Sequence, residues 1–300
     1  MELFGGIEAG GTKFVCMVGT SPRHLVAETR FRTGDPVDTI RQALDFFASF
    51  ALKGELAGVG IASFGPLDLD PRSATYGYIT STPKPGWSQV DLYGGIRRGL
   101  NLPVAFDTDV NAAAFGEQYW IPANRSLDPF LYVTVGTGIG VGVIVNGAPL
   151  HGMVHGEAGH FAIPHDRQND PFPGVCPFHG DCLEGLASGL AMQARWRQSA
   201  ESLPDGHPGW GLEADYIASA LVNLIYAYSP RRIVVGGGVS QHAGFHQVIR
   251  SKVQTRLNGY IRSPQVMEKI DELITPPSLG NRSGGLGAIA LAMRAVRAGA

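Results

Sequence analysis

The 300-residue sequence has only three cysteines, too few for the disulfide framework that holds small secreted domains together. Its formal net charge is only −2, so no general attraction to nucleic acid or to anionic membranes is expected. The most apolar stretch, residues 130–145, is interrupted by threonine and four glycines and predicts two buried strands instead of a membrane span. The N-terminus lacks the basic segment of a signal peptide. These absences favour a cytoplasmic protein without nucleic-acid or membrane partners.

The composition supports a globular enzyme with a large core. Hydrophobic residues make up 44% of the chain and charged residues 17%, and a chain of this length usually divides into two domains. No linker, low-complexity tract or charge run separates such domains. We therefore expect two interlocked domains.

Two of the three cysteines fall within a stretch rich in metal ligands. His160, Cys176, His179 and Cys182 have the spacing H-x15-C-x2-H-x2-C, in which a tight turn presents three ligands and a longer loop returns the fourth. Four protein ligands predict a structural zinc ion, because no coordination position is left open for a reactant. From spacing alone, the fourth ligand could instead be His155 or His165, with His151 a weaker alternative.

A glycine turn joins two apolar runs at the N-terminus. Residues 3–7 and 13–18 read as strands that flank the sequence EAGGT. The glycines of the tip let backbone N–H groups approach a phosphate, and the Thr12 and Lys13 side chains can donate to its oxygens. The Glu8 carboxylate could hold Mg²⁺ through water. The residues concerned are Glu8, Gly10, Gly11, Thr12 and Lys13. A bare hairpin without a ligand is the alternative interpretation.

The same unit appears a second time. Residues 131–135 and 141–145 flank GTGIG, in which Gly136, Thr137 and Gly138 could cradle a second part of a polyphosphate. Two such hairpins predict a duplicated fold and a phosphate clamp across an interdomain cleft. A third glycine turn, Gly236–Gly238, follows the expected strand 232–235 and could leave room for a base and ribose, or simply be a tight strand-to-helix turn.

Polar residues follow two further expected strands. Strand 56–61 runs into a turn at Gly65 that places Asp68 at its lip, and strand 104–106 runs into the sequence DTDVN. The two aspartates there, Asp107 and Asp109, could cap a helix, or one could face a bound hydroxyl. The loop 83–87 is expected to border a cleft. Helices are expected from Asp35 onward and over 184–197, 215–228 and 286–296.

Seven motifs in this order resemble those of the ROK sugar kinases, within the larger actin and hexokinase-like fold: GIEAGGTK, GVGIASFGPLD, DTDVNAAAFGE, VTVGTGIGVG, EAGHF, CPFHGDCLEG and IVVGGGVS. The resemblance implies an α/β, two-lobed (ribonuclease H-like) fold with duplicated domains and an interdomain cleft. The N-terminal lobe would span 1–115, and the last helix, about 284–300, could return to it. The C-terminal lobe would span 116–283 and carry the zinc loop 157–184.

The resemblance also assigns roles to residues. Asp109 matches the family's catalytic base, and His160 matches its zinc histidine, which favours His160 over the competing histidines. The positions expected to bind the sugar are Gly65, Asp68, Thr108, Asp109, Glu157, His160 and Glu184. The residues expected to contact the nucleotide are those of the two hairpins, those of the third glycine turn, and Thr134.

Two differences from the family pattern indicate which branch of the family the chain resembles. The chain has C-x2-H-x2-C where most members have C-x-C-G-x2-G-C, and Thr108 where most have Asn. Both departures, and the loop STPKPGW, are similar to the bacterial fructokinase branch. We therefore expect the protein to phosphorylate a hexose at its 6-hydroxyl, with D-fructose as the first choice of substrate. The expected cofactors are ATP, Mg²⁺ and a structural Zn²⁺. The expected oligomer is a homodimer.

Three other functions compete with this expectation. A glucokinase or mannokinase of the same family would differ only in the sugar. A sugar-sensing repressor of the family would need a helix-turn-helix domain, for which there is no room before the hairpin that begins at residue 8. An ATPase of the same superfold would act on a partner protein, and the paired acids and zinc loop argue for a sugar instead.

Overall fold

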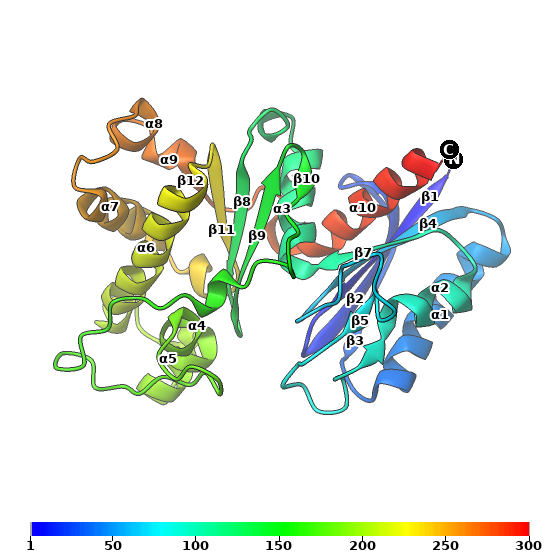
Figure 1. The fold of residues 1–300 in the computed structure, drawn as a ribbon, viewed down its shortest axis with the longest axis horizontal. Coiled ribbons are helices and arrows are strands. Elements are labelled where there is room, and N and C mark those ends of the chain that lie inside the picture. The colour runs from blue at the N-terminus through cyan, green and yellow to red at the C-terminus, as the bar shows by residue number, and fades with distance from the viewer. Residues whose placement is uncertain (1, 300) are drawn as a thin grey trace. The chain divides into compact units, whose positions relative to one another are not determined.

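The computed structural model describes residues 2–299, which divide into two compact units (Figure 1). Unit 1 contains the chain up to Ser126, residues 147–156 and the chain from Asn281 onward, and unit 2 contains residues 127–146 and 157–280. The boundary expected at residue 115 lies inside a continuous helix, α3 (Asp109–Trp120), and the chain divides only after that helix has ended. The last helix, α10 (Ser283–Gly299), groups with unit 1.

Unit 1 is built on a five-stranded sheet with the order β3-β2-β1-β4-β7. β2 pairs antiparallel with β1 and β3, whereas β4 pairs parallel with β1 and β7. The central strands are apolar along most of their length because helices cover both faces of the sheet. The strands are β1 (Leu3–Ala9), β2 (Lys13–Ser21), β3 (His24–Arg32), β4 (Leu56–Ser63) and β7 (Val104–Thr108).

Two consecutive glycines of β1 show how the helices pack on this sheet. Side chains alternate between the faces of a strand, and a Cβ at Gly5 would meet Phe47 of α1 (Pro36–Leu52), whereas one at Gly6 would meet the backbone of α10. Helix α2 (Leu92–Leu100) packs beside α1. Helix α1 begins where the sequence predicts, because the Asp35 carboxylate accepts a hydrogen bond from the Val37 N–H at 2.9 Å.

The loop that was expected to border a cleft contributes to the core of unit 1. Its Trp87 is fully buried, packs against Phe14 and Phe64, and donates from its indole N–H to the Gly34 carbonyl at 2.9 Å. Two short strands flank the loop, β5 (Tyr78–Ile79) and β6 (Val90–Asp91). The expectation is wrong for Trp87, because a large apolar ring gains more from burial than from solvent contact at a cleft.

Unit 2 repeats the central part of this arrangement. Its sheet contains β9, β8, β11 and β12 in that order, with β8 antiparallel to β9 and parallel to β11, and β11 parallel to β12. The strands β2, β1, β4 and β7 of unit 1 have the same sequence of pairings. The duplication expected from the two glycine hairpins is therefore present. The strands are β8 (Phe130–Val135), β9 (Ile139–Val145), β11 (Arg232–Gly236) and β12 (Ile274–Thr275).

The helices of unit 2 include one departure from expectation. Residues 184–197 form two helices instead of one, because Ser188 is extended and its hydroxyl accepts from the Ala191 N–H at 3.1 Å, which starts a new helix. Within residues 2–299, no helix has both the length and the apolar composition needed to cross a lipid bilayer. The helices are α4 (Leu183–Ala187), α5 (Gly189–Trp196), α6 (Gly209–Tyr228), α7 (Phe245–Leu257), α8 (Pro264–Met267) and α9 (Ile270–Leu273).

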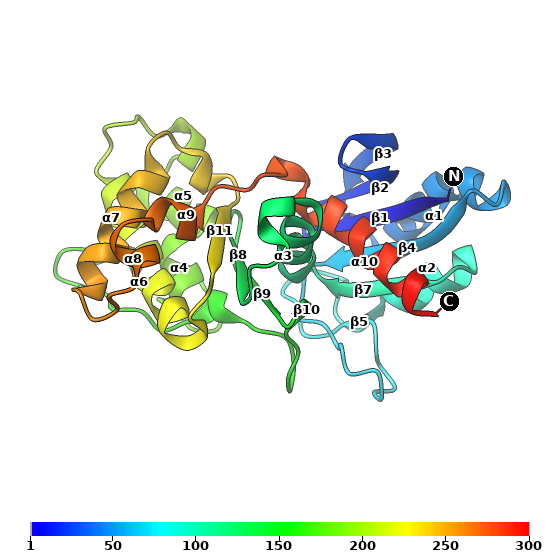
Figure 2. The same cartoon turned by 90° about the horizontal axis from the view of Figure 1, so that it is seen from above.

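Helices α3 and α10 lie against each other in unit 1 and meet through glycines (Figure 2). A Cβ on Gly287 would lie 1.8 Å from the Ala112 carbonyl oxygen, and one on Gly116 would lie 2.8 Å from the Gly287 Cα. The two backbones can approach this closely only because both positions lack a side chain.

Replacing Gly287 by Ala should therefore push α10 away from α3 and lower the free energy of unfolding by about 1–3 kcal/mol, the usual cost of overpacking. Gly95→Ala is the matched control in the same unit, because its Cβ would lie 3.6 Å from Ile40 in ordinary contact and should leave stability unchanged or raised. Denaturant unfolding of both variants measures the difference. Equal stabilities would contradict the close packing of α3 on α10.

Candidate active site and metal centre

The buried carboxylate of Asp107 organises the junction between β7 and α3. Asp107 is 3% exposed, and its Oδ1 accepts from the Thr108 N–H and the Asn111 side-chain amide, each at 2.8 Å. Its Oδ2 lies 2.9 Å from Nε2 of His151, and this hydrogen bond raises the pKa of His151. Because both oxygens are engaged inside the protein, Asp107 is poorly placed to take a proton from a substrate.

Asp109 has a different environment two residues later. It is the first residue of α3 and is only partly buried, and its Oδ1 accepts from the Val110 N–H at 2.9 Å. Thr108 before it is buried and caps the helix, with its hydroxyl accepting from the Asn111 N–H at 3.1 Å. Of these three residues, Asp109 alone combines a carboxylate with solvent access.

The first glycine hairpin presents an exposed tip in unit 1. The Gly10 N–H donates to the Lys13 carbonyl at 2.9 Å, which closes the turn, and the Thr33 hydroxyl donates to the Gly10 carbonyl at 2.6 Å. Thr12 and Lys13 are exposed, and nothing lies within 4 Å of a Cβ built on Gly11. The tip is thus rigid at its base and open at its end, as a backbone phosphate site requires.

The carboxylate of Glu8 points from β1 toward the first turn of α10. Its Oε2 accepts from the Gly285 N–H at 3.2 Å. Burial raises the pKa of Glu8, and the nearby charge of Lys13 acts in the opposite direction. Glu8 is therefore held at a helix N-terminus, where the helix dipole favours a negative charge.

The second glycine hairpin is joined to Glu184 within unit 2. The Gly136 N–H donates to the Gly138 carbonyl at 2.9 Å, and Oε2 of Glu184 accepts from the Ile139 N–H at 2.9 Å. A Cβ on Gly138 would lie 2.5 Å from the same carboxylate oxygen, so a larger residue there would displace the Glu184 carboxylate. An expected sugar contact and an expected phosphate contact are thus neighbours, and Thr137 between the two glycines is exposed.

Glu157 carries a perturbed carboxyl group near Glu184. Burial of the carboxyl, and next the negative charge of Glu184, raise the pKa of Glu157 to about 7, although the residue as a whole keeps substantial solvent exposure. An acid that titrates near neutral pH is typical of functional sites.

The four ligands expected from spacing come together in unit 2. Their donor atoms all lie within 4.8 Å of one another. Nδ1 of His160 is 3.5 Å from Sγ of Cys182 and 3.7 Å from Sγ of Cys176, which is 3.6 Å from Nδ1 of His179. This set could hold a metal ion, and His160 contributes Nδ1 to it.

The three competing histidines are engaged elsewhere. Nε2 of His155 accepts from the Leu67 N–H at 2.9 Å, and His151 pairs with Asp107. Nδ1 of His165 lies 2.9 Å from an oxygen of Asp181, and its Nε2 lies 2.9 Å from a backbone carbonyl. Of the candidate histidines left open by the spacing, His160 is the one that lies in the cluster with Cys176, His179 and Cys182.

The third glycine turn is only partly open. A Cβ on Gly236 would lie 2.3 Å from the Tyr132 hydroxyl, and one on Gly237, where φ is +91°, would lie 2.3 Å from the Val135 carbonyl. The protein itself therefore requires both glycines, as in a tight strand-to-helix turn, and their contact with a nucleotide stays a prediction. At Gly238 the space is open, because nothing lies within 4 Å of a Cβ position.

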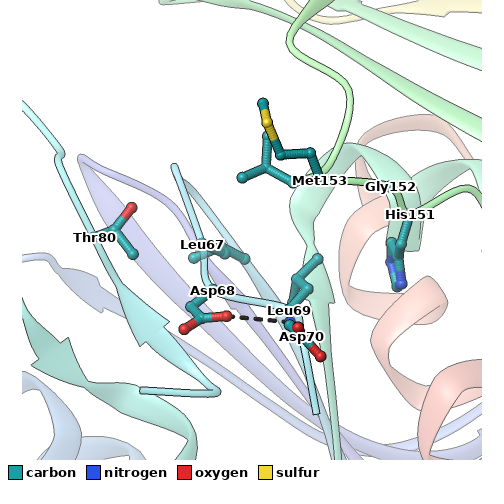
Figure 3. Close-up of a pocket in the computed structure, with 9 residues that line it drawn as sticks. Leu67, Asp68, Leu69, Asp70, Thr80, His151, Gly152 and Met153 are labelled. Atoms are coloured by element: carbon teal, nitrogen blue, oxygen red, sulfur yellow. Dashed lines mark hydrogen bonds between the residues drawn. The ribbon is translucent and has the colours of Figure 1, made fainter. Parts of the chain in front are cut away.

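The turn after β4 borders a cavity of about 150 Å³ in unit 1 (Figure 3). Asp68, which lines it, is already engaged: its carboxylate accepts from the hydroxyls of Ser73 at 2.5 Å and Thr75 at 2.7 Å and from the Asp70 N–H at 3.1 Å. These bonds lower its pKa. The cavity wall also includes Leu67, Leu69, Thr80 and residues 151–154.

Some supporting residues were not anticipated from the sequence. The hydrogen bond from Leu67 to His155 joins positions 88 residues apart, and the pair of Asp107 and His151 joins positions 44 apart. Asp170, which accepts from Tyr216 at 2.6 Å and from Arg195 at 3.2 Å, lies in no motif. Contacts at such separations leave no local pattern in one sequence.

The chain is similar to known proteins over nearly its whole length. The model of the ROK family matches residues 4–295. The chain is 43% identical to a fructokinase of Streptococcus mutans, over 98% of each chain, and 40% identical to a fructokinase of Zymomonas mobilis, over 98% of this chain and 97% of that one. It resembles the crystal structure of a ROK hexokinase from Thermus thermophilus with a TM-score of 0.78 and 24% identity over 99% of each chain.

Proposed function

Because the chain belongs to the ROK family, we propose that it is a fructokinase that transfers the γ-phosphoryl group of ATP to the 6-hydroxyl of D-fructose. The observation that carries this proposal is the identity of 43% and 40% to two fructokinases over nearly the whole chain. The duplicated α/β fold, which is also that of a ROK hexokinase, supports the same reaction class.

Asp109 would act as the general base. Phosphoryl transfer asks the protein mainly for positioning and charge neutralisation, so one carboxylate near the attacking hydroxyl is enough for proton removal. Asp109 is partly exposed, whereas the alternative, Asp107, is 3% exposed with both oxygens engaged. The proton of the 6-hydroxyl would pass to the Asp109 carboxylate as the oxygen attacks in line.

The two glycine hairpins would hold the ATP phosphates through backbone N–H groups. The exposed tip at Gly11, Thr12 and Lys13 fits this role. In the turn Gly136–Gly138 the exposed Thr137 would serve, because the Gly136 and Ile139 N–H groups already donate within unit 2. Gly238, the open member of the third turn, and Thr134 at the end of β8 would contact the rest of the nucleotide. Mg²⁺ would offset phosphate charge, with Glu8 acting through water because its Oε2 already accepts from Gly285.

The sugar would be oriented by acids and by the metal-site histidine. Glu157 and Glu184 offer acceptors for sugar hydroxyls, and Glu184 is held in place by the Ile139 N–H. Since Nδ1 of His160 belongs to the metal cluster, its Nε2 would be available to the sugar. Gly65 would contribute backbone, whereas Asp68 and Thr108, whose side chains serve internal hydrogen bonds, would support the site from behind.

We expect ADP release from Mg-ATP to depend on added fructose and to be slower with glucose or mannose at the same concentration. A coupled assay with each hexose, and without sugar, measures this directly. Faster turnover of glucose or mannose would make the chain a different kinase of the same family. A rate of ADP release that no hexose increases would contradict sugar phosphorylation altogether.

Replacing Asp109 by Asn should lower kcat by about 10² to 10⁴ because it removes the base and keeps the shape of the side chain. The KM for fructose should stay within a few-fold of the wild-type value, since general-base catalysis acts in the transition state. Asp45→Asn, on the exposed face of α1, is the matched control and should be fully active. Retention of more than about a tenth of the wild-type kcat would show that the base lies elsewhere.

The His/Cys cluster would bind zinc with no open coordination position. Zn–S bonds of about 2.3 Å and Zn–N bonds of about 2.0–2.1 Å at tetrahedral angles place nitrogen and sulfur roughly 3.6 Å apart. Three of the four nitrogen–sulfur separations in the cluster are 3.5, 3.6 and 3.7 Å, and all donor atoms lie within 4.8 Å of one another. When bound, the ion would cross-link the loop that carries Glu157, His160 and Glu184, and with four protein ligands it would not act as a Lewis acid.

Purified protein should therefore contain about one zinc per chain without added metal, the number expected for one closed four-ligand site. Cys176→Ser should lose the metal and unfold at a lower temperature, whereas Cys16→Ala, in the core of unit 1, should keep it. Elemental analysis and thermal unfolding of both variants provide the measurement. Full zinc content and full stability in Cys176→Ser would show that these four residues do not form a zinc site.

A further inference from the structure

A ten-residue segment, Gly147–Gly156, groups with unit 1 although the chain on both sides of it belongs to unit 2. It contains one short strand, β10 (Ala148–Pro149), and is otherwise irregular. Its last residue, Gly156, directly precedes Glu157, which is assigned to the sugar above. Whatever holds this segment in unit 1 therefore also limits where Glu157 can lie, because consecutive Cα atoms are about 3.8 Å apart.

His155 makes the most buried of the contacts that hold the segment. Its ring is 6% exposed, and its Nε2 accepts from the Leu67 N–H at 2.9 Å. The same ring lies against Gly65, where a Cβ would come within 3.3 Å of both Cε1 and Nε2. An accepting Nε2 requires the neutral imidazole with its proton on Nδ1, and burial lowers the pKa of His155, which favours that neutral form.

Two further side-chain contacts hold the segment within unit 1. Nε2 of His151 pairs with Oδ2 of Asp107 at 2.9 Å, and the His151 side chain is 39% exposed. The Gly147 carbonyl accepts from the Arg294 guanidinium of α10 at 3.3 Å. The guanidinium contact is exposed and the His151 imidazole is partly exposed, so the His155 bond is the most enclosed of the three.

The segment also shapes the cavity beside the Gly65 turn. Leu67, Asp68 and Leu69 from the turn, together with residues 151–154 from the segment, form most of its wall (Figure 3). His155, the residue after this part of the wall, joins the segment to the turn through its buried bond to the Leu67 N–H. The His155 ring therefore helps to set the separation of the turn and the segment.

We propose that His155 is a positioning residue for the sugar, which clamps the turn Gly65–Leu67 to the segment that leads into Glu157. This inference rests on the proposed kinase function, since it assigns His155 to the sugar and not to ATP. His155 acts through the backbone of the turn and through the chain that follows it. It takes no part in the proton transfer.

The test compares His155→Gln with His155→Leu. Gln can place an oxygen near the position of Nε2 and accept from the Leu67 N–H, whereas Leu fills the space and leaves that donor without an acceptor. We expect Leu to raise the KM for fructose about tenfold or more, given the cost of an unsatisfied buried donor, with the KM for ATP within about twofold. Gln should restore the KM for fructose to within about threefold of the wild-type value.

Hydrogen exchange measures the clamp itself, independently of its effect on the KM for fructose. Hydrogen exchange of peptides that cover residues 64–70 and 150–157 should accelerate in His155→Leu and not in His155→Gln. His242→Leu is the matched control, because its ring stacks on Trp210 at 3.7 Å in unit 2, and it should lower stability without changing the KM for fructose.

Equal effects of Gln and Leu, or an unchanged KM for fructose in Leu, would overturn the proposal even with a fully active wild type. If Leu does not fold, the Gln variant decides: a KM for fructose raised more than about tenfold would overturn the clamp, and a near-normal value with normal exchange would support it. A wild type with no activity on any hexose would instead overturn the proposed function, and this inference with it. The wild-type assay run first distinguishes the two failures.

Discussion

The buried carboxylate of Asp107 is the constraint on which the rest of the site in unit 1 depends. A carboxylate that is 3% exposed is stable only if its oxygens receive hydrogen bonds, and the start of α3 and His151 supply them. These bonds fix the end of β7 and the first turn of α3, and so fix Asp109. They also tie the segment Gly147–Gly156 to the same strand end. The position of the proposed base and the path of the chain toward Glu157 thus have a common anchor.

The duplicated sheet explains why the glycine hairpins occur where they do. In each unit an antiparallel pair of strands is joined by a glycine turn, and its first strand then pairs parallel with a later one. Backbone donors that need no side chain suit a phosphate, which differs little from one nucleotide to another. Sugar selection must come from less regular parts of the chain. The loop 157–184 and the turn after β4 are such parts, and each is held by long-range side-chain contacts.

Features with a local cause could be predicted from the sequence. The Asp35 cap, the two glycine hairpins and the cluster at Cys176, His179 and Cys182 each lie within a few residues along the chain. Features decided by tertiary packing could not be predicted in this way. The burial of Trp87, the break at Ser188 and the filling of space beside Gly236 by Tyr132 depend on partners that no local pattern specifies. The clamp at His155 belongs to this second group, because its acceptor and donor are 88 residues apart.

The central claim is that the chain transfers a phosphoryl group from ATP to the 6-hydroxyl of fructose. The phosphorylated product identifies both the sugar and the oxygen that attacks, so phosphorus-31 NMR of a reaction with ATP, Mg²⁺ and fructose tests the claim most directly. We expect fructose 6-phosphate and ADP in equal amounts. Fructose 1-phosphate would place a different hydroxyl at Asp109, and inorganic phosphate without a sugar phosphate would contradict the kinase reaction itself.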